Sequence, residues 1–297
     1  MSMTRRSFLA SSAAVLAATA LAEESATAKK SPIRKAVNLN MVNVKDASVA
    51  DKFKIIRDAG FDGIELNRPD AVPIDEILKA RDASGLAIAG VICSTHWGKP
   101  LSHNDPAVRE QGMRGVRLAL QDCAELGCER MLLVPGVVDK KTSYSDAYTR
   151  SLAAIKELAA DAEKAKCRIA IENVWNHFIM TPLEAARFVD EVNSPWVGWH
   201  FDIGNVITYG WPEQWVRILG KRIYNLHIKE YSRKRSEAEG LWKGFGVELG
   251  EGDVGWPDVM KALAEIDYNG WGILEVPGGD AARIKFLAER TDKIFAG

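Results

Sequence analysis

The sequence carries almost no net charge. Its 297 residues include 39 Lys and Arg against 40 Asp and Glu, which gives a formal charge of −1. A protein that binds nucleic acid or an anionic membrane by electrostatic attraction needs a basic surface, and this composition supplies none. Hydrophobic residues make up 47 % of the chain, which is enough for a folded core and excludes a disordered chain. We therefore expect a globular protein without a nucleic acid partner.

Cysteine is scarce, and none of the four residues belongs to a C-x-x-C pair. Redox motifs and many zinc sites depend on such closely spaced pairs. The cysteines lie in apolar segments that read as strands and helices. Free, buried thiols are therefore the better interpretation for a chain of this length. The four are Cys93, Cys123, Cys128 and Cys167.

The apolar run near the N-terminus, residues 8–21, is too short for a comfortable membrane span. It follows Arg5 and Arg6 and leads into Ala-Leu-Ala at residues 20–22, which fits a small-x-small cleavage site. This combination is typical of a twin-arginine secretory signal. We predict that residues 1–30 are a signal peptide with a short linker. The mature protein is then periplasmic, with no membrane attachment once the signal is removed.

Beyond residue 30 the chain has no linker rich in Pro, Gly or Ser. Short β-branched runs alternate eight times with stretches of helical periodicity. Eight such units predict one domain, residues 31–297, folded as an α/β protein with a (β/α)8 TIM barrel. An open doubly wound sheet would place a G-x-G-x-x-G turn after its first strand, and none occurs there. The predicted strands are residues 36–42, 63–66, 87–93, 130–134, 168–172, 197–202, 224–229 and 272–276.

Helices are predicted in the segments between these strands and after the last one. One connection, residues 231–255, is much longer than the others and carries charges, glycines and Trp242. A loop of this length in a compact domain is usually functional. The predicted helices are residues 49–59, 74–83, 106–126, 145–166, 182–192, 212–219, 256–266 and 281–295.

Each of the last four predicted strands ends in a side chain that can bind a metal ion. The C-terminal ends of barrel strands meet at one mouth, where active sites lie. A single acid in such a place is commonly structural, but three carboxylates and an imidazole would repel unless a cation lies among them. Ligands that are mainly oxygen favour one Mn²⁺, Co²⁺ or Mg²⁺ ion, with zinc as an alternative. The four side chains are those of Glu172, Asp202, His227 and Glu275.

Seven short motifs follow one another along the chain. They are GFDGIEL at 60–66, CSTH at 93–96, IEN at 171–173, DIGN at 202–205, HIKE at 227–230, LGEGDV at 249–254 and ILE at 273–275. In this order the sequence resembles the sugar phosphate isomerase/epimerase superfamily, which has a xylose isomerase-like TIM barrel. The nearest branches are L-ribulose-5-phosphate 3-epimerase, hydroxypyruvate isomerase and the tagatose/allulose 3-epimerases. The resemblance covers about residues 35–295.

The resemblance implies one divalent metal ion held by Glu172, Asp202, His227 and Glu275. Glu172 and Glu275 would also be the catalytic acid/base pair. Such an enzyme removes a proton beside a sugar carbonyl, forms a cis-enediolate, and returns the proton. Return to the opposite face is epimerisation, and return to the next carbon is aldose–ketose isomerisation. The implied partner is a small carbohydrate, and related enzymes are homodimers or homotetramers.

Three further positions match substrate contacts of the family. Arg233, six residues after His227, falls where the 3-epimerases have a substrate-contacting Arg. His96 and Glu65 match residues that line the mouth. The resemblance therefore implies that all three contact the sugar.

Lys229 and two tryptophans are also predicted to bind substrate. Lys229 lies two residues beyond His227 on the same strand face, so it should reach into the site. The flat faces of Trp97 and Trp175 can stack on a sugar ring, and Trp211 and Trp242 are further candidates for such stacking. His200 shares the face of Asp202, and a structural role is its better interpretation.

Two departures from the family pattern bear on the substrate. The tagatose-type enzymes have a His three residues after the strand-six Asp, where this chain has Asn205 as in the ribulose-phosphate branch. That branch places basic residues directly after the strand-three His, whereas Trp97 and Gly98 follow His96 here. The predicted export also argues against a sugar phosphate substrate, because sugar phosphates are mainly cytoplasmic. We therefore predict an unphosphorylated sugar, keto-sugar or glycoside.

The sequence is also compatible with two other functions. A metal-dependent lyase that eliminates the aglycone from a 3-keto-glycoside starts with the same proton abstraction, and the long connection and export suit a bulky substrate. A metal-binding or sugar-binding barrel without turnover is the other. The endonuclease IV-like branch shares the fold, but it needs a basic groove and more than the five histidines present here.

Overall fold

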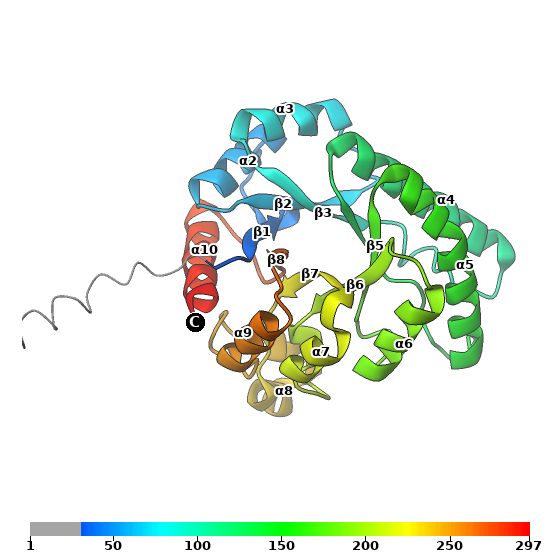
Figure 1. Ribbon diagram of the computed structural model, residues 1–297. Helices are drawn as coiled ribbons and strands as arrows, with labels where there is room; N and C mark the ends of the chain where they lie inside the picture. Colours follow the sequence, from blue (N-terminus) through cyan, green and yellow to red (C-terminus); the bar gives the residue numbers. More distant parts are fainter. Residues whose placement is uncertain (1–30) are drawn as a thin grey trace, which may run out of the picture. The chain divides into compact units, whose positions relative to one another are not determined.

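The computed structural model describes residues 31–297, with eight parallel strands at the centre. The strands are β1 (Arg34–Asn38), β2 (Gly63–Arg68), β3 (Ala87–Cys93), β4 (Arg130–Leu133), β5 (Arg168–Glu172), β6 (Val197–Asp202), β7 (Ile223–Ile228) and β8 (Trp271–Leu274). Each pairs with the next, and β1 pairs with β8, so the sheet closes into a barrel with helices outside it (Figure 1). The predicted TIM barrel is confirmed.

The helices begin and end at residues typical of helix termini. They are α2 (Val49–Asp58), α3 (Ile74–Ser84), α4 (Pro106–Leu126), α5 (Tyr144–Ala165), α6 (Pro182–Val192), α7 (Pro212–Leu219), α8 (Arg233–Glu239), α9 (Trp256–Glu265) and α10 (Ala281–Ala296). Ser48, Asp105, Ser143 and Thr181 each accept a hydrogen bond from an N–H group in the first turn of the following helix. Gly127 ends α4 in the left-handed conformation, with φ 68°.

Strand register determines where the strand-end side chains lie. It pairs Glu172 of β5 with His200 of β6, and Asp202 of β6 with His227 of β7. Glu275 directly follows β8, and its N–H donates a hydrogen bond to the last residue of β7. Because all strands are parallel, the C-terminal ends of these strands meet at the same mouth of the barrel.

Two segments differ clearly from the prediction. The first strand ends at Asn38 rather than at residue 42, because the Asn38 side chain accepts the Asn40 N–H and starts a 3-10 helix, Leu39–Met41. The connection at residues 231–255 is not a plain loop, since it contains α8 and a second 3-10 helix, η4 (Leu241–Phe245). Helix α8 has no buried residue, so the sequence carries no apolar periodicity that would have revealed it.

The four cysteines are buried and free, as predicted. Within the part of the chain that the structure describes, none of the helices is both long enough and apolar enough to cross a membrane. The predicted twin-arginine signal, residues 1–30, lies outside the described residues, so that assignment stays a prediction.

Helix α4 packs so closely on the loop after β3 that a Cβ atom at Gly115 would collide with the Thr95 side chain. We expect Gly115→Ala to lower the free energy of unfolding by about 1–3 kcal/mol, the usual cost of overpacking. At an open helix position the same change would instead stabilise by about 1 kcal/mol. Urea unfolding of the wild type and the variant measures the difference.

Thr95→Ala provides the control, because it removes the Oγ1 and methyl atoms involved in that collision. The double variant should recover part of the lost stability. Strictly additive losses in the two single variants would contradict the proposed contact.

Candidate active site

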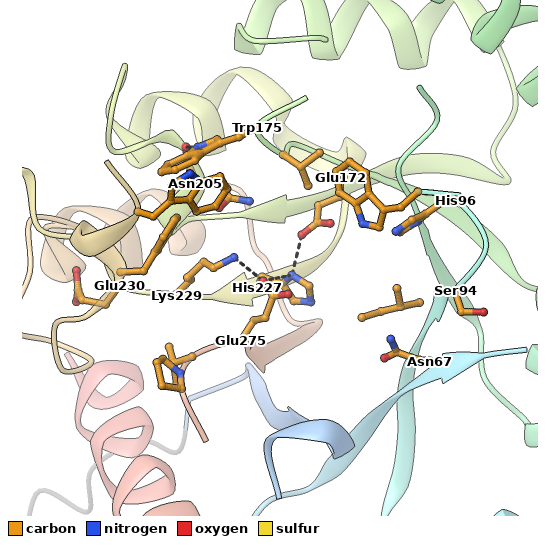
Figure 2. A pocket seen from close by; sticks show the side chains of 17 residues that line it. Asn67, Ser94, His96, Glu172, Trp175, Asn205, His227, Lys229, Glu230 and Glu275 are labelled. Carbon is orange, nitrogen blue, oxygen red and sulfur yellow. Dashed lines mark hydrogen bonds and ion pairs between the residues drawn. The ribbon is translucent and has the colours of Figure 1, made fainter. Parts of the chain in front are cut away.

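The four side chains predicted as metal ligands come together at the C-terminal mouth of the barrel. One potential ligand atom from each of Glu172, Asp202, His227 and Glu275 lies within 4.8 Å of the others. His227 Nδ1 is 2.8 Å from Glu172 Oε1, 3.4 Å from Glu275 Oε2 and 3.9 Å from Asp202 Oδ2. Figure 2 shows Glu172 of β5, His227 of β7 and Glu275, which follows β8, pointing toward one another.

Lys229 extends from β7 into this group, in the direction predicted from its strand face. Its Nζ atom donates to Glu275 Oε2 at 2.6 Å (Figure 2). It also donates to Asp202 Oδ2 at 3.0 Å. A Cβ atom at Gly204 would lie 2.8 Å from the Lys229 Cβ, so only glycine leaves room for the stem of the lysine. The burial of Lys229 would lower its pKa, but the carboxylates of Asp202 and Glu275 outweigh that effect and keep the ammonium charged.

Formal charge favours a divalent cation in this place. The carboxylates of Glu172, Asp202 and Glu275 contribute −3 and Lys229 contributes +1, which leaves −2 for a bound ion to neutralise. Three carboxylate oxygens and one imidazole nitrogen are a donor set suited to Mn²⁺, Mg²⁺ or Co²⁺. The residues present therefore fit one divalent metal ion.

The two carboxylates of the predicted acid/base pair have different environments. Burial raises the pKa of Glu172 to about 7. Burial would also raise the pKa of Glu275, but the charges of His227 and Lys229 outweigh it and hold that pKa below its ordinary value. Without a metal, Glu172 therefore keeps a proton more readily than Glu275 does.

A second polar layer lies beneath His227 in the barrel. Glu65 Oε2 is 3.2 Å from His227 Nε2 and accepts a 3.1 Å hydrogen bond from Asn38 Nδ2. The ring of His200 packs 4.1 Å from the ring of His227. Because Glu65 accepts from Nε2–H, it turns Nδ1 toward the three carboxylates, which is how outer carboxylates orient histidine ligands in metal sites.

Asp202 is fixed by two asparagines that the sequence analysis did not assign to the site. Asn173 accepts the Asp202 N–H at 3.0 Å and donates to its carbonyl at 2.8 Å. The Asn205 N–H donates to Asp202 Oδ1 at 2.9 Å, and its amide donates to the Asn173 carbonyl at 3.0 Å. The IEN and DIGN motifs contain these residues, but their mutual contacts join two strands and are not visible in either motif alone.

The site opens into a cavity of about 590 Å³. Four of the predicted substrate contacts line it, namely His96, Trp97, Trp175 and Lys229. Trp175 and His96 lie on opposite sides of the carboxylates (Figure 2). Trp242, a further stacking candidate, also lines the cavity, whereas Trp211 does not. Lining residues that the sequence analysis did not assign to the site include Asn67, Ser94, Asn205, Glu230 and Phe245.

Two predicted substrate contacts do not reach the cavity in this geometry. Glu65 is fully buried below His227. Arg233 points instead toward the loop after β6, where its guanidinium donates to the carbonyls of Ile207 at 2.9 Å and Gly210 at 3.0 Å. Their family positions gave the correct part of the barrel but not the direction of the side chains.

His96 is held in one tautomer. Its Nδ1 accepts a 3.1 Å hydrogen bond from the Val134 N–H, so the ring proton of the neutral form is on Nε2. Burial lowers the pKa of His96 to about 4. The ring is therefore neutral at physiological pH and has one N–H available to donate to a ligand.

Glu230 anchors the end of the long connection. Its carboxylate accepts hydrogen bonds from the N–H of Gly250 at 2.8 Å, the N–H of Val254 at 3.3 Å and Nε1 of Trp256 at 2.8 Å. The HIKE and LGEGDV motifs are thus in direct contact. This contact fixes the segment that follows β7 against the mouth of the barrel.

Divalent metal binding should release protons near neutral pH. Glu172, with a pKa of about 7, must be ionised to act as a ligand. Burial would lower the pKa of His227, but the surrounding carboxylates raise it, so its ring must also lose a proton. We expect the apparent affinity for Mn²⁺ to fall by about tenfold or more for each pH unit below 7. Titration calorimetry in buffers of different ionisation enthalpy counts the protons, and Glu172→Gln should release fewer. An affinity that is constant across this range would contradict the ligand assignment.

Loss of the Glu65 carboxylate should weaken metal binding although Glu65 itself does not touch the ion. We expect Glu65→Ala to lower Mn²⁺ affinity by about 10–100-fold, the usual effect of removing an outer hydrogen-bond partner of a ligand. Glu65→Gln keeps an acceptor for His227 Nε2–H and should restore most of the affinity. Competition with a chelator measures both variants, and equal affinities for Glu65→Ala and the wild type would disprove the orienting role.

Comparison with solved structures shows the same fold in several sugar-converting enzymes. D-allulose 3-epimerase from Methylomonas sp., solved with D-allulose, is 22 % identical with a TM-score of 0.66, covering 83 % of this chain and 84 % of that one. 3-Keto-D-glucoside 4-epimerase from Escherichia coli is 15 % identical with a TM-score of 0.70, covering 88 % and 98 %.

Comparison of sequences gives relatives of similar length. L-ribulose-5-phosphate 3-epimerase of Escherichia coli is 24 % identical over 242 residues, which span 76 % of this chain and 81 % of the relative. The profile of the xylose isomerase-like TIM barrel family matches residues 53–292, most of the chain. The protein therefore belongs to the xylose isomerase-like TIM barrel family.

Proposed function

We propose that this protein is a sugar epimerase or isomerase that depends on one divalent metal ion and acts on an unphosphorylated sugar or keto-sugar. The observation that carries the proposal is the convergence of Glu172, Asp202, His227 and Glu275 at one end of a cavity of about 590 Å³. Relatives named as L-ribulose-5-phosphate 3-epimerase and D-allulose 3-epimerase support the reaction class.

A divalent ion held by these four side chains supplies Lewis-acid stabilisation of negative charge on a sugar carbonyl oxygen. Glu172 and Glu275 are the catalytic pair: one carboxylate removes the proton beside the carbonyl, giving a cis-enediolate, and the other returns a proton. Lys229 holds Glu275 in position through its 2.6 Å hydrogen bond. His96 donates from Nε2–H to a sugar oxygen.

The charges of the cavity support an unphosphorylated substrate. Among the described residues that line it, Lys229 is the one Lys or Arg, and its ammonium is already bound to Asp202 and Glu275. His96 is neutral because burial lowers its pKa to about 4. A phosphate group would therefore meet the carboxylates of Glu172 and Glu230 without a free cation to balance it.

Elimination of the aglycone from a 3-keto-glycoside is the second candidate. It uses the same proton abstraction, and Trp242 and Phe245 from the long connection line the cavity, where they could contact an aglycone. The shared fold with 3-keto-D-glucoside 4-epimerase favours a keto-glycoside substrate. We also propose that the protein acts in the periplasm, on the basis of Arg5, Arg6 and the apolar run that follows.

Replacement of either catalytic carboxylate should abolish proton transfer. We expect Glu172→Gln and Glu275→Gln each to lower solvent deuterium exchange into the substrate by at least about a hundredfold, the usual contribution of a general acid or base. Mass spectrometry of free ketohexoses and 3-keto-glycosides incubated in D₂O measures the exchange. It also separates the two candidates, because only elimination releases a free aglycone.

The exposed Glu110 on α4 serves as the matched control, since Glu110→Gln makes the same chemical change away from the cavity. Removal of metal by a chelator should stop exchange, and added Mn²⁺ should restore it. Exchange that persists in both catalytic variants would contradict the roles of Glu172 and Glu275. Absence of exchange in the wild type with every substrate would rule out the proposed enzyme and leave a binding protein.

A further inference from the structure

Three aromatic side chains line one side of the cavity, and a fourth, Tyr231, packs behind them. Trp175 follows β5, Tyr231 follows β7, and Trp242 and Phe245 come from η4. The ring of Trp175 lies 4.7 Å from that of Trp242, 4.9 Å from that of Phe245 and 5.8 Å from that of Tyr231, measured between ring centres. We call these four residues the aromatic wall.

Hydrogen bonds hold two members of the aromatic wall in place. Trp175 Nε1 donates to the Asn205 carbonyl at 2.8 Å. The Tyr231 hydroxyl lies 2.8 Å from both Ser236 Oγ and the Leu241 carbonyl, which ties η4 to α8. The wall is therefore formed before any ligand binds, so a ligand would meet an ordered apolar surface.

The aromatic wall starts next to the catalytic carboxylates. Lys229 Nζ is 2.6 Å from Glu275 Oε2 and 5.1 Å from the centre of the Phe245 ring. A sugar bound at Glu172 and Glu275 would therefore have one side close to Phe245. A substituent on that side of the sugar would extend along the wall toward Trp242.

The members of the aromatic wall differ in exposure. Tyr231 is fully buried, whereas Trp242 is 70 % exposed although it lines the cavity. Because Trp242 adjoins Trp175 and Phe245, its exposed ring belongs to a contiguous apolar surface, and such surfaces commonly mark binding sites. The cavity volume of about 590 Å³ also lies within the range of about 300–1,000 Å³ found for pockets that hold drug-sized ligands.

We propose that the aromatic wall is a subsite for a second ring, joined to the reacting sugar by a glycosidic bond. This inference rests on the proposed function and narrows its substrate to glycosides. The ring has a flat apolar face, which an aromatic aglycone and the carbon face of another sugar both provide. A surface that only joined two copies of the chain would not need to share a cavity with Glu172 and Glu275.

Unreactive glycosides test the subsite independently of turnover. Calorimetry on the Mn²⁺-loaded protein compares methyl and phenyl glycosides of glucose, galactose and xylose, in both anomers. For at least one sugar we expect the phenyl glycoside to bind about three- to tenfold more tightly, as one aromatic contact provides. A comparison of the affinities for methyl cellobioside and methyl glucoside shows whether a second sugar ring increases affinity as much as a phenyl group does.

Trp242→Ala should bring that affinity ratio close to one. Leu241→Ala is the matched control, because Leu241 is a neighbouring exposed side chain of η4 that does not line the cavity. It should leave the ratio unchanged. Equal binding of the two glycosides for every sugar, or a preference that survives Trp242→Ala, would overturn the subsite.

Two further readouts keep the outcomes distinct. Sedimentation of the wild type and of Trp242→Ala measures the oligomeric state. If the variant loses oligomers and the wild type shows no preference for phenyl glycosides, the aromatic wall is a subunit interface and the proposal is overturned. Deuterium exchange into ketoses and keto-glycosides tests the proposed function by itself. Absence of exchange with a clear phenyl preference would reject the enzyme and retain the subsite as that of a glycoside-binding protein.

Discussion

Three carboxylates gathered at the mouth of the barrel are the constraint on which the site depends. Buried negative charges are costly unless positive charge lies between them. Lys229 neutralises one of the three and bridges Asp202 to Glu275. The remaining charge, together with the imidazole of His227, is what a divalent ion would neutralise. Metal binding and the stability of this end of the barrel are therefore coupled through the same side chains.

The need to hold and neutralise these buried carboxylates explains which residues surround the site better than contact with a substrate does. Asn173 and Asn205 hold Asp202 by its backbone and its carboxylate, and Gly204 leaves room for the stem of Lys229. Glu65 lies too deep to touch a sugar, but it fixes the ring of His227. The motifs that resemble the family are thus largely a supporting frame for four side chains. A frame of this kind can serve many substrates, since the reaction depends on the site and not on the fold.

The fold and the four converging side chains could be predicted because both depend on local pattern. Alternating periodicity identified the eight units, and a charged residue at the end of an apolar strand is visible without knowledge of its neighbours. The depth of a side chain in the barrel and the direction in which it points could not be predicted in the same way. A period of two indicates which strand face carries Glu65, but not how far below the mouth it lies, and Arg233 turned toward carbonyls 23 and 26 residues earlier in the chain. Helix α8 escaped prediction because it buries no side chain.

The cavity joins two surfaces of different origin. Its polar end comes from β5 to β8, where register fixes the carboxylates, and part of its apolar side comes from η4, in the connection after β7. Strands tolerate little change because a shift of one residue reverses every side chain, whereas a connection can change length and sequence freely. Proton transfer beside a carbonyl is therefore the property this chain should share with its relatives. If the proposed subsite exists, the choice of substrate should depend mainly on the aromatic wall, because Glu230 fixes the end of the connection that carries Trp242 and Phe245.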